Sequence, residues 1–294
     1  MKKLIALGLV VAFLAFAYFR PLTLFFAARR VYVAAIGVKS EFVQVGKHRI
    51  HYWTAGEGSP LVLVHGVAMR AEDWAPLFGA LSQQHRIYAL DLLGYGESDQ
   101  PRDAEYSVAT QANIVRGFMD AMHLQQPDVA GVSMGGWIAL KVAAEHPDRV
   151  KRLALLSSAG LSYDSQLTEN TFSATTLEEQ RLSFALQSDL APRLPDFILR
   201  DFLRRSKKKA WVIRASMRSA LTRADLVMDG KLQRVRMPVL IVAGTSDHIV
   251  PFSHAQRLKK EMPHAQLVTL YGCGHLAVVE CRKATLRAVL AFLR

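Results

Sequence analysis

Three residues far apart in the chain have the types and surroundings needed for nucleophilic attack on a carbonyl group. Ser133 lies in Gly-Val-Ser-Met-Gly (131–135), directly after the apolar and small-residue run 129–132. A serine hydroxyl becomes an effective nucleophile when a base takes its proton and an acid orients that base. Asp247 and His275 follow in that chain order, each on a glycine-containing loop behind an apolar run. We therefore expect the three side chains to form one Ser-His-Asp row.

Each of these residues also has a simpler structural explanation. Glycine and serine meet in ordinary loops, Asp247 could cap the helix expected after Pro251, and His248 or His254 could be proposed as the base. His275 is preferred because it follows the last strand-like run, and parallel strands bring their carboxyl ends to one edge of a sheet.

Glycines explain how the serine would be presented. Larger side chains at 131 or 135 would collide with the neighbouring strand and helix at the sharp turn that carries Ser133. Acyl transfer also requires donors for the developing oxyanion. We expect the backbone N–H groups of Val67 and Met134 to supply them.

Val67 follows a loop that begins His65-Gly66, directly after the first buried run. Gly66 allows the backbone to turn so that the Val67 N–H can face Ser133. His65 is expected to organise this loop rather than to act as a second base.

The elements that must position these residues are short apolar runs alternating with helical stretches. Strand-like apolar runs, mostly without a polar face, lie at 61–64, 87–90, 129–132, 153–156, 239–242 and 267–270. Apolar residues recur at helical spacing in 107–123, 134–146 and 253–262. The segments 42–45 and 49–53 indicate an antiparallel hairpin. This alternation predicts an α/β fold with a mostly parallel sheet flanked by helices. Strand-like runs are absent from the sequence between 161 and 234, which we interpret as a helical cap inserted before the last two strands.

The motifs together resemble the α/β-hydrolase family. LVLVHG (61–66), DLLGYGESD (91–99), GVSMGG (131–136), GTSDHIVP (244–251) and GCGH (272–275) stand in the order of that family. Within it, the chain is most similar to membrane-anchored monoacylglycerol lipases and related bacterial lipases and esterases.

This resemblance implies an α/β-hydrolase fold with Ser133, Asp247 and His275 as the catalytic triad and Val67 and Met134 as oxyanion donors. It also implies acyl-ester lipids as substrates, with no metal or cofactor required. The DLLGYGESD loop is expected to be structural, with Tyr95 and Ser98 at most touching the substrate entrance.

Other activities remain open at this stage. The same triad could cleave a carbon–carbon bond of an aromatic ring-fission product, or transfer an acyl group to an acceptor other than water. A binding protein that has kept the fold without turnover is a further alternative.

Charge and composition restrict the choice of partners. The chain has 294 residues, 51% of them hydrophobic, with a net charge of +12. Residues 1–30 hold five basic and no acidic side chains, and residues 193–223 hold ten basic and two acidic ones, so the remainder is close to neutral. Because the charge is confined to two segments and no supporting motif is present, we do not expect nucleic acid as a partner.

Both basic segments are also apolar, which indicates a membrane. Residues 4–19 carry no charge, and a second apolar run, 22–28, follows Arg20-Pro21. Sixteen residues fall short of the about 20 that span a bilayer, but tilting or snorkelling of Arg20 would extend the segment. A cleaved signal peptide is the alternative, because Ala15-Phe16-Ala17 fits a cleavage site.

The second basic segment predicts an amphipathic helix over 196–205. Ile198, Leu199, Phe202 and Leu203 would form its apolar arc, and Arg200, Asp201, Arg204 and Arg205 its polar arc. With Lys207-Lys208-Lys209 it could contact anionic lipid, or it could be a solvated helix packed on the core.

We divide the chain into a membrane anchor or signal segment (1–30), two hydrolase core parts (31–160 and 235–294) and the cap (161–234). Membrane association, most simply with a bacterial-type inner membrane, is expected, and a secreted or periplasmic protein is the alternative. Cys273 and Cys281 are too few for a multi-bridge scaffold or a four-cysteine zinc site. Whether they pair, which acyl chain and alcohol are preferred, and the oligomeric state are left open by the sequence.

Overall fold

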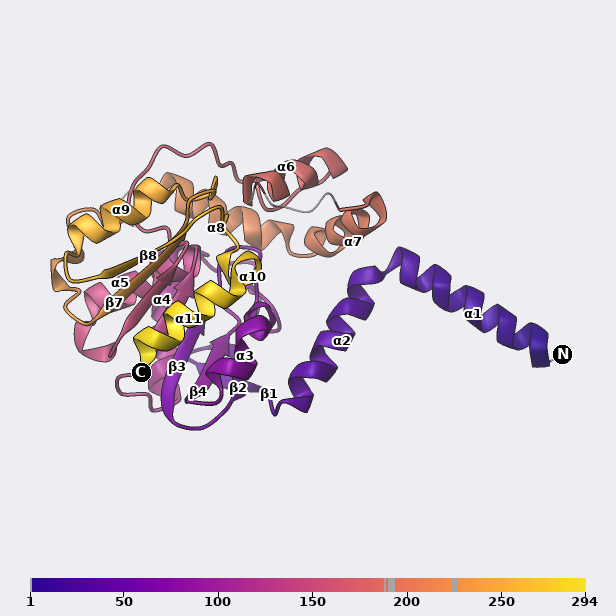
Figure 1. Ribbon diagram of the computed structural model, residues 1–294, viewed down its shortest axis with the longest axis horizontal. Coiled ribbons are helices and arrows are strands. Elements are labelled where there is room, and N and C mark those ends of the chain that lie inside the picture. The colour runs from indigo at the N-terminus through magenta and orange to yellow at the C-terminus, as the bar shows by residue number, and fades with distance from the viewer. Residues whose placement is uncertain (1, 188, 190–193, 224–226) are drawn as a thin grey trace.

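The fold was analysed in a computed structural model that describes residues 2–187, 189, 194–223 and 227–294. Within these residues an eight-stranded sheet has the order β1-β2-β4-β3-β5-β6-β7-β8 (Figure 1). Its strands are β1 (Lys39–Val45), β2 (His48–Ala55), β3 (Ser59–Val64), β4 (His85–Leu90), β5 (Asp128–Val132), β6 (Leu153–Leu156), β7 (Val239–Gly244) and β8 (Gln266–Leu270). β1 and β2 form an antiparallel hairpin and β2 pairs antiparallel with β4, while all other pairs are parallel. The mostly parallel sheet predicted from the apolar runs is confirmed.

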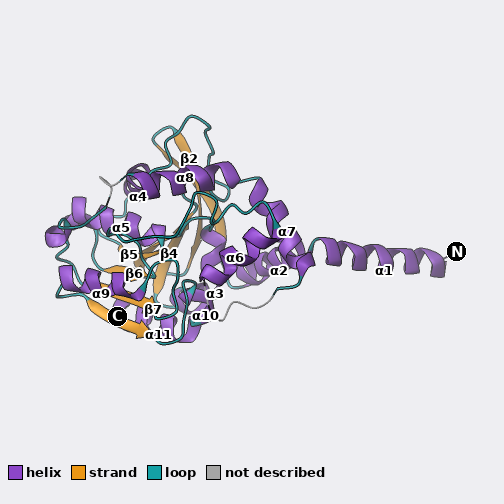
Figure 2. Cartoon of the chain, turned by 90° about the horizontal axis from the view of Figure 1, so that it is seen from above, coloured by secondary structure: helices purple, strands orange, loops and turns teal. Residues whose placement is uncertain are grey.

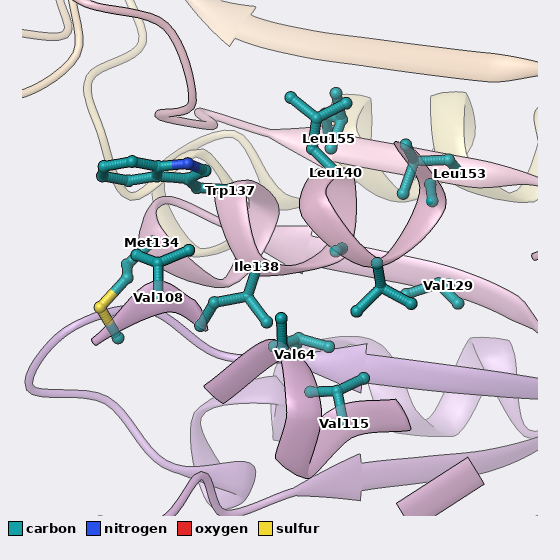
Figure 3. Packing of buried hydrophobic residues seen from close by; sticks show 14 of the residues in the cluster. Val64, Val108, Val115, Val129, Met134, Trp137, Ile138, Leu140, Leu153 and Leu155 are labelled. Carbon is teal, nitrogen blue, oxygen red and sulfur yellow. The ribbon is translucent and has the colours of Figure 1, made fainter. Parts of the chain in front are cut away.

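The inner strands β3, β5, β6 and β7 are buried on both faces, which explains why they lack a polar face, whereas the edge strand β1 is mostly exposed. On one face lie α4 (Val108–Ala121), α5 (Met134–Glu145) and α9 (Phe252–Glu261), and on the other lie α3 (Ala75–Leu81), α10 (Ala277–Glu280) and α11 (Arg282–Leu293). Successive residues of a strand pack on opposite faces of the sheet. Val129 packs with the first set of helices, and Ala130 packs with the second set. Figure 3 shows Ile138 of α5 packed close to Val64 of β3.

The stretch between β6 and β7 is helical where the structure describes it. It contains α6 (Leu177–Gln187), α7 (Asp196–Lys207), α8 (Ala210–Thr222) and the short 3-10 helix η4 (Leu232–Arg234). The predicted insertion of a helical cap before the last two strands is thus confirmed. The cap residues 188, 190–193 and 224–226 lie outside the described residues.

The N-terminal segment forms two helices, α1 (Lys2–Phe19) and α2 (Pro21–Ala35), which meet at a bend of 95°. Among the described residues, neither helix alone is long and apolar enough to cross a membrane, but Val10–Phe19 and Pro21–Ala35 pass that test together. In Figures 1 and 2, α1 extends away from the body of the protein. By contrast, α2 packs against the cap helix α7 and the core helix α3, and Leu22 and Val33 are buried. α2 therefore continues beyond residue 30 and contacts both the cap and the core.

One side chain on α7 differs from its predicted setting. The helical projection places Asp201 on the polar, solvated arc, but Asp201 is 1% exposed and its Oδ2 accepts a hydrogen bond from the backbone N–H of Leu22 at 3.0 Å. The partner comes from 179 positions away in the chain, so the periodicity of α7 alone could not reveal it.

Candidate active site

Ser133 stands at a strained turn between β5 and α5. Its backbone has φ 57° and ψ −123°, a left-handed conformation that residues with a side chain rarely adopt. A Cβ at Gly131 would collide with the carbonyl of Gly135, and a Cβ at Gly135 would collide with the carbonyls of Val64 and His65. The steric reason predicted for these two glycines is confirmed, and the turn holds the hydroxyl beyond the end of β5.

The structure brings Ser133, His275 and Asp247 into one hydrogen-bonded row. Ser133 Oγ lies 2.8 Å from Nε2 of His275, and Nδ1 of His275 lies 2.8 Å from Oδ2 of Asp247. Because an ionised carboxylate only accepts, Nδ1 carries the ring proton and Nε2 is free to accept the serine proton. Asp247 and His275 are both buried, so the row is shielded from water everywhere except at the serine.

Asp247 is fixed by its second oxygen. Oδ1 accepts the backbone N–H groups of Ile249 and Val250 at 2.9 and 2.8 Å. The side chain therefore organises its own loop and binds His275 as well. It does not cap the helix that follows, because the N-cap residue of α9 is Pro251 and no side chain caps that helix.

The other two histidines considered as bases lie outside the row. His254 is buried, and Leu161 N–H points to its Nε2 at 3.4 Å. Desolvation, with a contribution from Arg257, lowers the pKa of His254 to about 4. His248 is exposed and its Nε2 lies 2.8 Å from Asp189 Oδ1.

Two further contacts hold the loop of His275. Its backbone N–H donates to the carbonyl of Gln187, at the end of α6, at 2.6 Å. Cys273 and Cys281 form a disulfide with their Cα atoms 6.2 Å apart, which answers the pairing question that the sequence left open. The base is thus held by the cap on one side and by a covalent bridge on the other.

The loop expected to supply one oxyanion donor is organised by His65. Leu92 N–H donates to Nε2 of His65 at 3.0 Å, which leaves Nδ1 as the protonated nitrogen, and Nδ1 donates to Gly66 O at 2.8 Å. Complete burial lowers the pKa of His65 and favours this neutral form. In a trans peptide the Val67 N–H points away from Gly66 O, so the ring fixes the direction of that N–H.

Met134 is the first residue of α5, where backbone N–H groups have no partner within the helix. Val67 and Met134 both line the cavity that contains Ser133. Their position is suitable for stabilising an oxyanion, and this role remains a proposal.

The cavity in front of Ser133 has a volume of about 330 Å³ and is largely apolar. It is lined by Val67, Ser133, Met134, Trp137, Ala159, Leu161, Ser162, Tyr163, Ser165, Leu167, Phe172, Met217, Ala220, Leu221, Arg223, Val227, Ile249 and Val250. Most of its walls come from 159–172 and α8, which sequence reasoning did not assign to the site. The apolar residues inside the otherwise charged insertion were the sequence feature that could have indicated these cavity walls.

Tyr95 and Ser98 have the structural role expected for loop 91–99. Tyr95 is buried and donates to Ser216 Oγ at 2.8 Å, and Ser98 is buried and donates to Asp91 O at 2.6 Å. Neither lines the cavity. Both hydroxyls are engaged in fixing loop 91–99, because buried polar groups need partners. In the described part of the chain, no group of three His, Cys, Asp or Glu side chains is arranged to hold a metal ion.

Comparison with known proteins places this geometry in a family. The sequence model of proteins with the alpha/beta hydrolase fold matches residues 59–280. The chain belongs to the α/β-hydrolase family. A solved membrane phospholipase A, described as a bacterial virulence factor, is 28% identical with a TM-score of 0.85, over 100% of this chain and 98% of that one.

Curated relatives of this α/β hydrolase include enzymes with other chemistry. A 2-hydroxymuconate semialdehyde hydrolase of Pseudomonas sp. (strain CF600) is 27% identical over 79% of this chain and 86% of its own length. The dihydrolipoyllysine-residue acetyltransferase component of an acetoin cleaving system from Pseudomonas putida is 31% identical over 88% of this chain and 70% of its own. The family is therefore established, but membership alone does not identify the bond that is cleaved.

Proposed function

We propose that this α/β hydrolase cleaves carboxylic esters of acyl lipids, with monoacylglycerol-type substrates, through an acyl-enzyme formed on Ser133. The observation that carries the proposal is the Ser133–His275–Asp247 row opening into an apolar cavity. An acyl chain can bury its methylene groups against such walls, and each buried CH₂ contributes about 0.8 kcal/mol.

The mechanism follows from the hydrogen bonds of the row. His275 Nε2 takes the proton of Ser133 as Oγ attacks the ester carbonyl carbon, and Asp247 stabilises the imidazolium that results. The Val67 and Met134 N–H groups hold the oxyanion. The alcohol leaves with the proton from Nε2. A water molecule, deprotonated by His275, then attacks the acyl carbon and releases the carboxylic acid together with Ser133.

Carbon–carbon bond hydrolysis is the second candidate, because the Pseudomonas relative is named for a semialdehyde substrate. Ring-fission products of that kind are small and polar. Of the described residues that line the cavity, only Arg223 bears a charge, and its guanidinium pairs with Glu105 at 2.9 Å. An apolar cavity favours an acyl chain over a small anion, since a buried charge requires a partner.

We also propose that the protein is attached to a bacterial-type inner membrane, through α1 and α2 and through the basic surface of α7. Support comes from the helix pair, from the exposed Lys207 and Lys208, and from the likeness to a membrane phospholipase. The Cys273–Cys281 disulfide favours an oxidising compartment, such as the periplasm, for the catalytic domain. Release of the protein from isolated membranes by alkaline carbonate would contradict attachment through α1 and α2.

A substrate panel tests the activity. Full-length protein in detergent micelles is given monoacylglycerols, nitrophenyl esters of increasing chain length and a 2-hydroxy-6-oxo-dienoate, with Ser133→Ala as the blank. We expect acyl esters to be hydrolysed with the higher kcat/KM, and turnover to vanish in the blank. Faster cleavage of the dienoate would refute the ester assignment.

A further inference from the structure

We propose that Arg29 of the N-terminal helix α2 is a positioning residue for the oxyanion loop, defined here as residues 65–70. In this view α2 acts on the rate of attack by Ser133 and is more than a tether. The inference rests on the serine chemistry of the proposed function and does not depend on a lipid substrate. A chain of contacts runs from the cap to α2, from α2 to the 3-10 helix η1 (Ala71–Trp74), and from η1 to the loop.

The start of α2 is fixed to the cap. Asp201 of α7 accepts the Leu22 N–H, and Arg204 NH1 lies 2.8 Å from both Asp201 Oδ1 and the carbonyl of Phe19. One cap carboxylate and one cap guanidinium therefore hold both sides of the bend between α1 and α2. A buried carboxylate that meets a helix N-terminus and an arginine is well satisfied there.

The middle of α2 is seated on the core by an aromatic contact. The guanidinium carbons of Arg29, Arg70 and Arg205 lie 4.8, 4.4 and 4.9 Å from the ring centroid of Phe26. Arg205 belongs to the cap, and Arg70 is the last residue of the oxyanion loop. Phe26 therefore brings the cap, α2 and this loop together at a single ring.

Arg29 connects α2 to η1. Its Nη1 donates to Glu72 O at 3.1 Å, and Nη1 and Nη2 both lie 3.4 Å from Asp73 Oδ1. Its Nε lies 3.7 Å from Glu72 Oε1. The side chains of Arg29 and Glu72 are 15% and 3% exposed. Solvent screens these two charges less than it screens surface charges, and Nε and Oε1 are too far apart for a hydrogen bond.

The 3-10 helix η1 in turn fixes the end of the oxyanion loop. Asp73 Oδ2 accepts the Arg70 N–H at 3.1 Å, while its other oxygen faces Arg29. Asp91 Oδ1 accepts the Ala71 N–H at 2.7 Å. Inside the loop, Ala68 has φ 60°, a conformation that persists only when the surroundings impose it.

Loss of the Arg29 guanidinium would loosen this support. Burial raises the pKa of Glu72, and its remaining ion-pair partner would be Arg70, 2.9 Å away on the loop itself. Asp73 would keep the loop N–H but lose the guanidinium that orients it. The Val67 N–H would then be less well aimed at the oxyanion. Removing such a donor outright costs about 10²–10³ in kcat, so a displaced donor should cost roughly tenfold.

The test compares Arg29→Met with Arg29→Lys and with Arg30→Met in the full-length protein in micelles. Arg30 is a matched control, because it lies on the same helix and pairs with Glu97 at 2.6 Å on the surface. The readouts are kcat and KM on nitrophenyl acetate, the rate at which a fluorophosphonate labels Ser133, and the Tm. We expect R29M to lower kcat and the labelling rate about tenfold with KM little changed. R29K should recover most of the loss, and R30M should stay within twofold.

Several results would overturn the proposal. An R29M protein with kcat within twofold of wild type would do so, as would equal losses in R29M and R30M. If R29M does not fold, Asp73→Asn is used in its place. The asparagine amide oxygen can still accept the Arg70 N–H, while the charge that faces Arg29 is lost. An unchanged kcat and an unchanged labelling rate in D73N would then refute the proposal. A wild type that is labelled but hydrolyses no lipid ester would refute only the substrate, whereas an unlabelled wild type would refute the serine chemistry and this inference together.

Discussion

The substitution Asp247→Asn isolates the role of the acid in the catalytic row. In the native site Oδ1 accepts two backbone N–H groups, from Ile249 and Val250, and Oδ2 accepts the proton on Nδ1 of His275. An asparagine that keeps the two backbone bonds must present its NH₂ to Nδ1, which then has to be the acceptor. The ring proton moves to Nε2, where it blocks acceptance of the Ser133 proton. Rotating the amide restores the bond to Nδ1 but points NH₂ at two N–H donors.

Either orientation therefore removes the base while the loop keeps most of its bonds. A triad that loses its acid in this way loses about 10⁴-fold in kcat, which corresponds to about 5.4 kcal/mol in activation free energy. We expect this loss for nitrophenyl acetate, with a Tm close to that of wild type by differential scanning fluorimetry. Asp120→Asn is the control, because Asp120 pairs with Arg149 at 2.7 Å on the surface and does not line the cavity. If D247N kept kcat within tenfold of wild type, Asp247 would not orient His275 as described.

Two further predictions concern stability. Burial lowers the pKa of His254 to about 4, below its ordinary 6.5. As pH falls, the unfolded state therefore binds the proton before the folded state does. The stability from this group is complete above about pH 6.5 and is lost as pH falls toward 4. Between pH 7 and pH 5 the free energy of unfolding in urea should therefore fall by about 2 kcal/mol more for wild type than for His254→Gln. The glutamine amide oxygen of this variant can still accept the Leu161 N–H. If the unfolding free energies of the two proteins depended equally on pH, the result would count against a buried neutral imidazole. Replacing both Cys273 and Cys281 by serine opens a loop closed across eight positions and should lower the unfolding free energy by about 2.5 kcal/mol. A reductant should produce the same decrease in wild type and none in the double variant, and a wild type insensitive to reductant would contradict the disulfide.

Local patterns were sufficient to predict the sheet and the hydrogen-bonded row of Ser133, His275 and Asp247. Strands buried on both faces appear as continuous apolar runs, and a parallel sheet then forces the loops that follow them to one edge. Ser133, Asp247 and His275 each follow such a run, so their convergence could be predicted without coordinates. The glycines at 131 and 135 carried the same information in steric form.

Contacts between distant segments could not be predicted in this way. Asp201 has the periodicity of a solvated residue on α7, and its burial depends on where α2 begins, 179 positions earlier. Loop 91–99 is structural as expected, but the sequence did not indicate that Tyr95 would bind Ser216, 121 positions later. Helical periodicity reports which face of an element is apolar, and it carries no information on which distant group will cover that face. For the same reason, the contacts of Arg29 with Glu72 and Asp73 could not be predicted from the sequence.

The most direct test of the central claim is to find which residue carries the covalent intermediate. Full-length wild type, Ser133→Ala and His275→Ala are treated with a fluorophosphonate, and the site of modification is mapped by peptide mass spectrometry. The account predicts one phosphonyl group on Ser133 in wild type, none in S133A, and labelling slowed by several orders of magnitude in H275A. Modification of S133A at the wild-type rate, or labelling of H275A as fast as wild type, would contradict a site in which His275 activates Ser133.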